Sequence, residues 1–135
     1  MANRKALEET MELINSEIVD QFRAIVGAGF VIQDEEQRNE YGHDKTEDYQ
    51  FLPDLVLKPG TALEISEILK ICNIHRIPVT PRGAGTGLSG GALPIHKGVV
   101  ISMERFNKIL NIDELNLQAT VEPGVITEVF QNAVK

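Results

Sequence analysis

The segment from Pro81 to Gly91, called the glycine loop below, restricts the folds open to this chain more than any other stretch. Five of its eleven residues are glycine, against an average usage of about 7%. A glycine has no Cβ and reaches positive φ without strain, so the backbone can turn sharply and bring successive N–H groups close to an anion. Thr86 and Ser89 add hydroxyl donors, and Arg82 adds one positive charge. This pattern predicts an anion-binding loop in which main-chain amides are the principal donors.

The residues before the glycine loop predict a strand, a helix and a second strand. Leu55–Leu57 is a short apolar run closed by a Pro-Gly pair, which indicates a buried strand and its turn. Thr61 and Glu64 have the spacing of a capping box, and an apolar helix follows to about Asn73. Ile77–Thr80 then predicts a strand that enters the glycine loop directly. We expect a β-α-β unit whose two strands are parallel neighbours in one sheet.

Residues 1–40 show the helical period of 3.6 residues. One helix is expected to begin at Asn15-Ser16 and to end at Gly27, because a glycine just beyond the last apolar position commonly stops a helix. Asp34–Glu40 is expected to form a further short helix, and the polar segment Tyr41–Asp48 a loop. The apolar residues that define the period are Leu7, Met11, Ile14, Ile18, Phe22 and Val26.

After the glycine loop, the chain predicts three short strands and a helix. The strands are expected at Val99–Met103, Lys108–Ile112 and Gln118–Val121, and the helix at Ile126–Val134. Together these patterns predict an α/β (α+β) fold. A helical N-terminal segment, residues 1–48, is expected to precede a small, mostly parallel sheet with flanking helices in residues 49–135.

The composition argues against several classes of function. A net charge of −7 disfavours general affinity for nucleic acid, whose phosphates need clustered Lys and Arg. No apolar run reaches the ~18 residues of a membrane span, and we expect no secretory signal because the first residues lack an apolar core. The single cysteine, Cys72, cannot form an internal disulfide and predicts a reducing compartment, the cytoplasm. With 135 residues, one domain with one core is expected.

The glycine loop has other interpretations. A mobile turn without a ligand is disfavoured, because a strand enters the loop directly and hydroxyl residues alternate with the glycines. Gly85–Gly90 matches the G-x-G-x-x-G pattern of a dinucleotide-binding Rossmann unit, and Glu104 lies near the distance of its ribose-binding acid. That unit needs a helix at its third glycine, whereas Gly91–Gly98 is short and contains Pro94, so we expect no helix there. A Walker loop is excluded because no G-K-[ST] follows.

The run from Val79 to Pro94 closely resembles the FAD pyrophosphate loop of the vanillyl-alcohol-oxidase (PCMH-type) flavoprotein superfamily. Within it, the best match is the branch that contains the glycolate oxidase FAD-linked subunit, D-lactate dehydrogenase and D-2-hydroxyglutarate dehydrogenase. The resemblance implies that the chain is the first half of a PCMH-type FAD-binding domain. Further segments that resemble this branch, in the same order, are Asp44–Asp48, Phe51–Asp54, Ser102–Asn107 and Val121–Val125.

This resemblance also implies where and how FAD would bind. The pyrophosphate would lie on the glycine loop, and the Pro-Gly turn after a later strand would approach the flavin nucleotide. Binding would be reversible and non-covalent, because relatives that attach FAD covalently use a histidine in or beside the loop, where this chain has Thr86. The implied FAD-binding residues are Arg82, Gly83, Ala84, Gly85, Thr86, Gly87, Ser89, Gly90, Gly91, Pro123 and Gly124.

The activity that the resemblance implies is that of an FAD-dependent 2-hydroxy-acid dehydrogenase or oxidase. Such an enzyme oxidises a small D-2-hydroxy acid, such as glycolate or D-lactate, to the 2-oxo acid, and hydride passes to FAD. The family's catalytic and metal-binding residues lie in later segments. We therefore expect a truncated chain without the substrate domain, inactive alone, and other oxidase subunits as partners of the parent enzyme. A non-catalytic nucleotide- or phosphate-binding module, or a homodimer of the exposed fragment, are the alternative expectations.

The remaining polar residues are weaker candidates. The three histidines, His43, His75 and His96, have no metal-ligand spacing to one another or to the cysteine. The carboxylates of Asp44–Asp48 indicate a solvated loop rather than a pair of acid–base groups. For Arg82, a contact with the ligand and an exposed position on the loop are both open.

Overall fold

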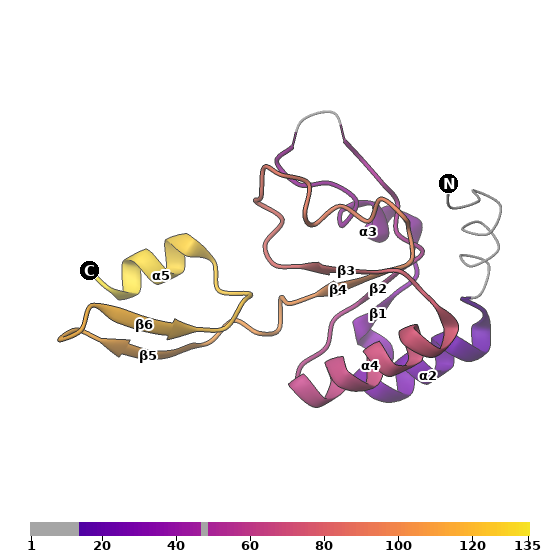
Figure 1. Ribbon diagram of the computed structural model, residues 1–135, viewed down its shortest axis with the longest axis horizontal. Helices are drawn as coiled ribbons and strands as arrows, with labels where there is room; N and C mark the ends of the chain where they lie inside the picture. Colours follow the sequence, from indigo (N-terminus) through magenta and orange to yellow (C-terminus); the bar gives the residue numbers. More distant parts are fainter. Residues whose placement is uncertain (1–13, 47–48) are drawn as a thin grey trace.

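A four-stranded sheet forms the centre of the fold, with the strand order β1-β2-β4-β3 (Figure 1). The computed structural model describes residues 14–46 and 49–135. β4 pairs in parallel with β2 on one side and with β3 on the other, and β1 pairs antiparallel with β2. The predicted α/β class with a mostly parallel sheet is therefore confirmed. The bounds are Val31–Ile32 for β1, Leu55–Leu57 for β2, Val79–Arg82 for β3 and Val99–Ser102 for β4.

The prediction that Leu55–Leu57 and Ile77–Thr80 form neighbouring strands is wrong, because β4 lies between β2 and β3. All of β4 is buried, which suits the central position, where neighbours cover both edges and both faces. Pro81, in β3, has no N–H to donate to a second ladder, so β3 fits at the edge of the sheet. The helix between β2 and β3 therefore crosses over the place that β4 fills.

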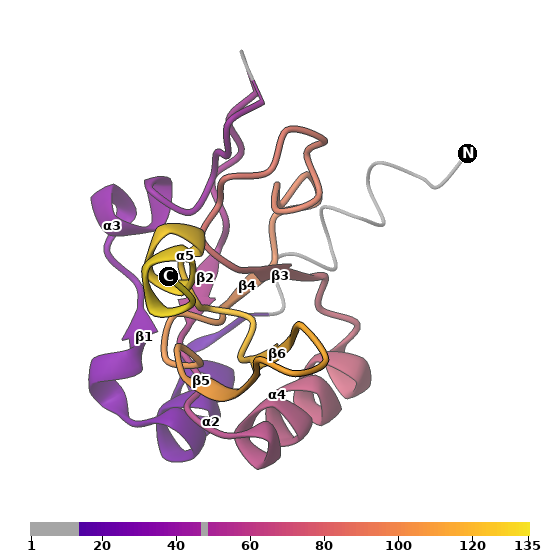
Figure 2. The same ribbon diagram turned by 90° about the vertical axis from the view of Figure 1, so that its left-hand side faces the viewer.

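Helices α2 (Ser16–Val26) and α4 (Ala62–His75) lie side by side on one face of the sheet (Figures 1 and 2). Both begin as predicted: the Asn15 side chain accepts the Ile18 amide, and Thr61 and Glu64 form a capping box. Each cap satisfies amides that a helix start leaves without partners. The main core lies between these helices and the sheet, and its fully buried side chains include Phe22, Leu55, Leu57, Ile68 and Ile101.

Residues 28–40 contain a strand that the helical period did not predict. Gly27 ends α2, a short 3-10 helix η1 (Ala28–Phe30) follows, and β1 then pairs with β2. Both residues of β1 are β-branched, and such side chains favour an extended backbone. Helix α3 (Glu35–Asn39) comes next and agrees with the short helix expected at Asp34–Glu40; Asp34 is its N-cap. The division of the chain at residue 48 stays a prediction, and residues 1–13 of the helical period lie outside the described residues.

The last part of the chain forms a unit of its own. Strands β5 (Ile109–Asp113) and β6 (Gln118–Val121) pair as an antiparallel hairpin, and helix α5 (Thr127–Ala133) lies beside it (Figure 1). The three elements agree with the predictions, but the hairpin does not join the four-stranded sheet. Leu115 and Leu117, at the hairpin turn, are exposed. Of the helices in residues 14–46 and 49–135, none is long and apolar enough to cross a membrane.

Cys72 is buried in the main core, and burial raises the pKa of its thiol to about 11 from its usual 9.0. Near neutral pH, the folded protein should therefore hold about 100-fold less thiolate at this position than an exposed cysteine, because each pKa unit is a factor of ten. We expect iodoacetamide to alkylate Cys72 in urea but not in the native chain, as followed by mass spectrometry. Rapid alkylation of the native chain would contradict the core position of this side chain.

Candidate functional site

The glycine loop leaves the sheet at the carboxyl end of β3, which extends through Arg82. Beyond the strand, the chain reaches β4 without forming a helix. The expected absence of a helix in Gly91–Gly98 is therefore confirmed, and with it the exclusion of a Rossmann unit. The loop lies beside the segment that follows α3 (Figures 1 and 2), and the Lys45 amide donates to the Gly87 carbonyl at 3.1 Å.

Main-chain amides of the glycine loop are available to a ligand. Within the part of the chain that the structure describes, no amide from Ala84 through Ser89 donates a hydrogen bond to the protein. The loop is also open, since a Cβ added at Gly87 or at Gly91 would meet no atom within 4 Å. A peptide N–H without a protein acceptor needs water or a ligand. Successive donors of this kind, with the exposed Thr86 and Ser89 hydroxyls among them, suit an anion such as a phosphate.

The side chain of Arg82 is buried, with 8% of its surface exposed, so the interpretation of an exposed loop arginine is wrong. Its guanidinium donates to the His43 carbonyl at 2.6 Å and reaches the Glu40 carbonyl at 3.5 Å. It also lies over the Tyr41 ring, 5.6 Å from the centroid. Burial lowers the pKa of Arg82, and the nearby acidic groups oppose that shift. The donors of this side chain are thus directed to the segment after α3.

Asp44 is also buried, at 8% exposure, so the prediction of a solvated loop is wrong at this residue. One carboxylate oxygen, Oδ1, accepts the Thr46 amide at 2.7 Å, while Oδ2 and the Thr46 hydroxyl lack partners with hydrogen-bond geometry among the described residues. Burial raises the pKa of Asp44, but Thr46, the nearby Gly90 amide and the charge of Arg82 outweigh it, so the net shift is downward. The carboxylate is ionised and faces the glycine loop. Positions 47 and 48 lie outside the described residues.

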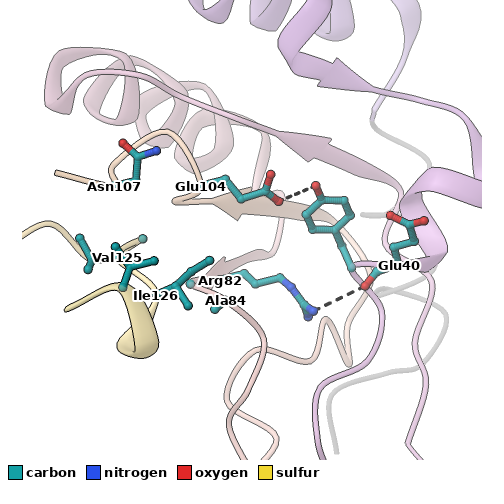
Figure 3. Close-up of a pocket in the computed structure, with 11 residues that line it drawn as sticks. Glu40, Arg82, Ala84, Glu104, Asn107, Val125 and Ile126 are labelled. Atoms are coloured by element: carbon teal, nitrogen blue, oxygen red, sulfur yellow. Dashed lines mark hydrogen bonds between the residues drawn. The ribbon is translucent and has the colours of Figure 1, made fainter. Parts of the chain in front are cut away.

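A cavity of about 540 Å³ lies beside the start of the glycine loop (Figure 3). Glu104 and Asn107 give it polar walls, and Val125, Ile126 and Val129 give it an apolar wall. The size is that of pockets which take small organic ligands. Of the predicted FAD-binding residues, Arg82, Gly83, Ala84 and Gly124 line this cavity, whereas Gly85, Thr86, Gly87, Ser89, Gly90, Gly91 and Pro123 do not.

The predicted Pro-Gly turn lies against the start of the glycine loop, since a Cβ at Gly83 would be 3.4 Å from the Pro123 carbonyl oxygen. Gly124 packs tightly within the protein: its amide donates to the Phe106 carbonyl, and a Cβ there would come within 2.1 Å of the Met103 carbonyl oxygen. The glycine is thus required by the protein itself, whether or not a nucleotide approaches. The structure brings the two predicted segments together although about 40 residues separate them in the sequence.

A polar network that sequence reasoning missed borders the same cavity. The Tyr41 hydroxyl donates to Glu104 at 2.5 Å, and Lys58 pairs with the other carboxylate oxygen of Glu104 at 3.1 Å. Burial, and then the bond to Glu104, raise the pKa of Tyr41. Burial opposes ionisation of Glu104, yet its bonds from Tyr41 and Lys58 lower its pKa overall. Only Glu104 carried a sequence signal, as the ribose-binding acid of a Rossmann unit. In the structure, its carboxylate bonds instead to Tyr41 and Lys58.

The structure offers no metal centre in residues 14–46 and 49–135, where no three His, Cys, Asp or Glu side chains gather closely enough to hold an ion. His43 contributes its carbonyl to Arg82 rather than its ring. Main-chain amides without protein acceptors and an adjoining cavity are the features that this part of the chain presents to a ligand.

Comparisons with known proteins give this arrangement a context. The family model described as an FAD binding domain matches residues 53–135. The chain is 44% identical to glycolate oxidase subunit GlcD of Bacillus subtilis, covering 85% of this chain and 24% of that protein. It is 34% identical to a D-lactate dehydrogenase of Anaerostipes hadrus, covering 90% of this chain and 26% of the relative. The chain thus spans about a quarter of the length of these relatives.

Solved structures agree with this result. The fold matches p-cresol methylhydroxylase with substrate bound at a TM-score of 0.79 and 26% identity, over 91% of this chain and 25% of that one. It also matches alkyldihydroxyacetonephosphate synthase at a TM-score of 0.75 and 20% identity, over 89% and 24% of the two chains, which supports the fold alone. The arrangement of sheet, helices and loop is therefore that of the N-terminal part of a PCMH-type domain.

Proposed function

Because this chain belongs to the FAD binding domain family, whose model matches residues 53–135, we propose that its glycine loop holds the pyrophosphate of FAD. The observation that carries the proposal is the row of amides from Ala84 through Ser89 that have no acceptor among the described residues. A diphosphate supplies acceptors to several such amides at once, and two hydroxyls lie among them. This binding needs no cluster of cations, which suits a chain of net charge −7.

The cavity beside the loop supports the same proposal. It lies where the first residues of the glycine loop meet the turn at Gly124, and its volume of about 540 Å³ admits a ring system of the nucleotide. Its lining includes the apolar side chains of Val125 and Ile126 and the carboxylate of Glu104. The residues present therefore fit FAD in both donor chemistry and space.

Bound FAD supplies the redox chemistry, and this part of the chain binds and orients it. We infer that binding is non-covalent, since no histidine occurs within the glycine loop. Flavin absorbance that stays with acid-precipitated protein would overturn this inference.

For the whole protein, we propose oxidation of a small D-2-hydroxy acid to the 2-oxo acid. The proposal rests on relatives that are named as a glycolate oxidase subunit, a probable D-2-hydroxyglutarate dehydrogenase and a D-lactate dehydrogenase. Since the first of these is a subunit, further oxidase subunits are proposed as partners. The lone cysteine keeps the cytoplasm as the proposed location. Anaerobic mixing of the FAD-loaded protein with glycolate, D-lactate or D-2-hydroxyglutarate tests the activity by the loss of visible flavin absorbance.

The FAD site itself is tested by Gly87→Ala. The added methyl group meets no protein atom within 4 Å, so we expect the free energy of unfolding to stay within about 0.5 kcal/mol of wild type. A ligand on the loop would meet that methyl group, and we expect the Kd for FAD to rise about tenfold, a loss of about 1.4 kcal/mol. The chain has no tryptophan, so flavin fluorescence anisotropy is the suitable signal.

Titrations with ADP and inorganic phosphate complete this test. Tighter binding of FAD than of either probe supports a flavin site. Equal binding of FAD and ADP would favour a nucleotide-binding module without redox function. Unchanged FAD affinity in Gly87→Ala would remove the glycine loop from the site.

A further inference from the structure

Arg82 has a position that a direct contact with the nucleotide does not explain. Its guanidinium donates to the His43 carbonyl at 2.6 Å and faces the Glu40 carbonyl, both in the segment after α3 (Figure 3 shows the Glu40 contact). The Tyr41 ring lies 5.6 Å away and covers the guanidinium. With 8% of its surface exposed, this side chain is built into the protein.

The glycine loop rests on the same guanidinium. A Cβ at Gly85 would lie 2.1 Å from Nη2 and 2.6 Å from Cζ of Arg82, so the loop backbone passes directly against that side chain. One further bond joins the loop to the segment after α3: the Lys45 amide donates to the Gly87 carbonyl at 3.1 Å.

From this geometry we propose that Arg82 is a positioning residue, which braces the glycine loop against residues 40–46 and so fixes the direction of its amides. The inference rests on the proposed FAD site and goes beyond it, because it assigns the positive charge of the loop to the protein and not to the ligand's phosphates.

The chain holds a matched control for this role. Arg105 lies against another glycine, Gly60, whose added Cβ would be 2.5 Å from Cζ of Arg105. Its guanidinium donates to the Lys58 carbonyl at 3.1 Å and stacks 3.8 Å from the centre of the Phe30 ring. Arg105 thus makes the same three kinds of contact at an exposed position, with the connection between β2 and α4 and with Phe30 of η1, away from the glycine loop.

The test compares Arg82→Ala, Arg82→Lys and Arg105→Ala by hydrogen exchange and by FAD titration. Without the brace, we expect faster exchange in Arg82→Ala at the hydrogen-bonded amides of Lys45, Thr46 and Leu93, which belong to the loop and to the segment packed on it, and no such change in Arg105→Ala. If the competent loop conformation falls to about a tenth of the population, the Kd for FAD rises about tenfold. Arg82→Lys should not restore it, because an ammonium cannot reproduce the planar fork that serves two carbonyls and packs flat under the loop.

The dependence of FAD affinity on salt concentration distinguishes a positioning role of Arg82 from a direct charge contact with the ligand. A braced loop predicts that the Kd for FAD depends on ionic strength equally in wild type and Arg82→Ala, since no charge contact with the phosphates is lost. Restored affinity in Arg82→Lys, or a weaker salt dependence in Arg82→Ala, would show that Arg82 pairs with the ligand and would overturn the inference. If wild type binds no FAD, the proposed function fails, while the exchange measurement still decides whether Arg82 braces the loop. Unchanged exchange in Arg82→Ala overturns the brace.

Discussion

Gly98→Ala is expected to lower the free energy of unfolding by about 3 kcal/mol, a large part of the stability of a domain this size. Gly98 has φ +68, and an alanine there costs about 1–2 kcal/mol in the left-handed region. Its Cβ would also lie 2.2 Å from the Pro78 carbonyl oxygen, which is backbone and accepts the Val99 amide. Such overpacking adds a further cost of about 1–3 kcal/mol.

The position of Gly98 explains why the damage cannot stay local. Its carbonyl accepts the amides of Asp54 and Leu55, and its own amide donates to the Asp54 side chain at 2.9 Å. Gly98 therefore joins the starts of β2, β3 and β4. Gly29→Ala is the control, because its Cβ would meet nothing within 4 Å. Urea denaturation followed by circular dichroism measures both variants, and equal stability of the two would contradict the described packing of Gly98 on Pro78.

Gly85→Ala is expected to weaken FAD binding by about 10- to 100-fold under the proposed function. The residue has φ +71, and its new Cβ would overlap the Arg82 guanidinium, so either the loop or the arginine must move. Because the loop is exposed at most of its positions, we expect the global stability to fall by only about 1–2 kcal/mol. Isothermal titration with FAD and urea denaturation measure the two effects separately.

Two further variants identify the cause of that loss. Gly85→Asn relieves most of the backbone strain, since asparagine tolerates the left-handed region, but it keeps the overlap with Arg82 and should remain defective. In the double variant Gly85→Ala with Arg82→Ala, the guanidinium is absent and the methyl group has room. The two losses of affinity should therefore not add. Strict additivity would mean that Gly85 and Arg82 act on the nucleotide independently.

The elements that the sequence predicted well are those that local chemistry determines. Helix α2 follows from Asn15 and Gly27 at its ends, and α4 follows from the capping box at Thr61, since each signal lies within a few residues of its effect. The place of β4 between β2 and β3 was not predictable in this way. The strand order depends on two preferences: the burial of β4 on both faces favours the centre of the sheet, and Pro81 favours the edge for β3. These preferences decide the order only when all the strands are placed in one sheet.

The same distinction between local and long-range features applies to the candidate site. The glycine loop is contiguous, so its amides and hydroxyls could be read directly from residues 83–91. Tyr41, Lys58 and Glu104 come from three separate segments, and nothing in the spacing of those residues indicates that one hydrogen bond and one ion pair join them. The burial of Arg82 could not be predicted from the sequence either, because its acceptors are backbone carbonyls, which every residue has whatever its side chain.

The loop amides that have no acceptor among the described residues have a consequence for the conditions in which the protein can work. Peptide N–H groups keep their proton over the pH range in which proteins stay folded. The chain has a net charge of −7, so its overall field does not attract anions from solution. Retention of a diphosphate would then depend on the contour of the main chain and hardly on acidity or dissolved salts. A cofactor held in this manner stays in place when the ionic composition of its surroundings fluctuates.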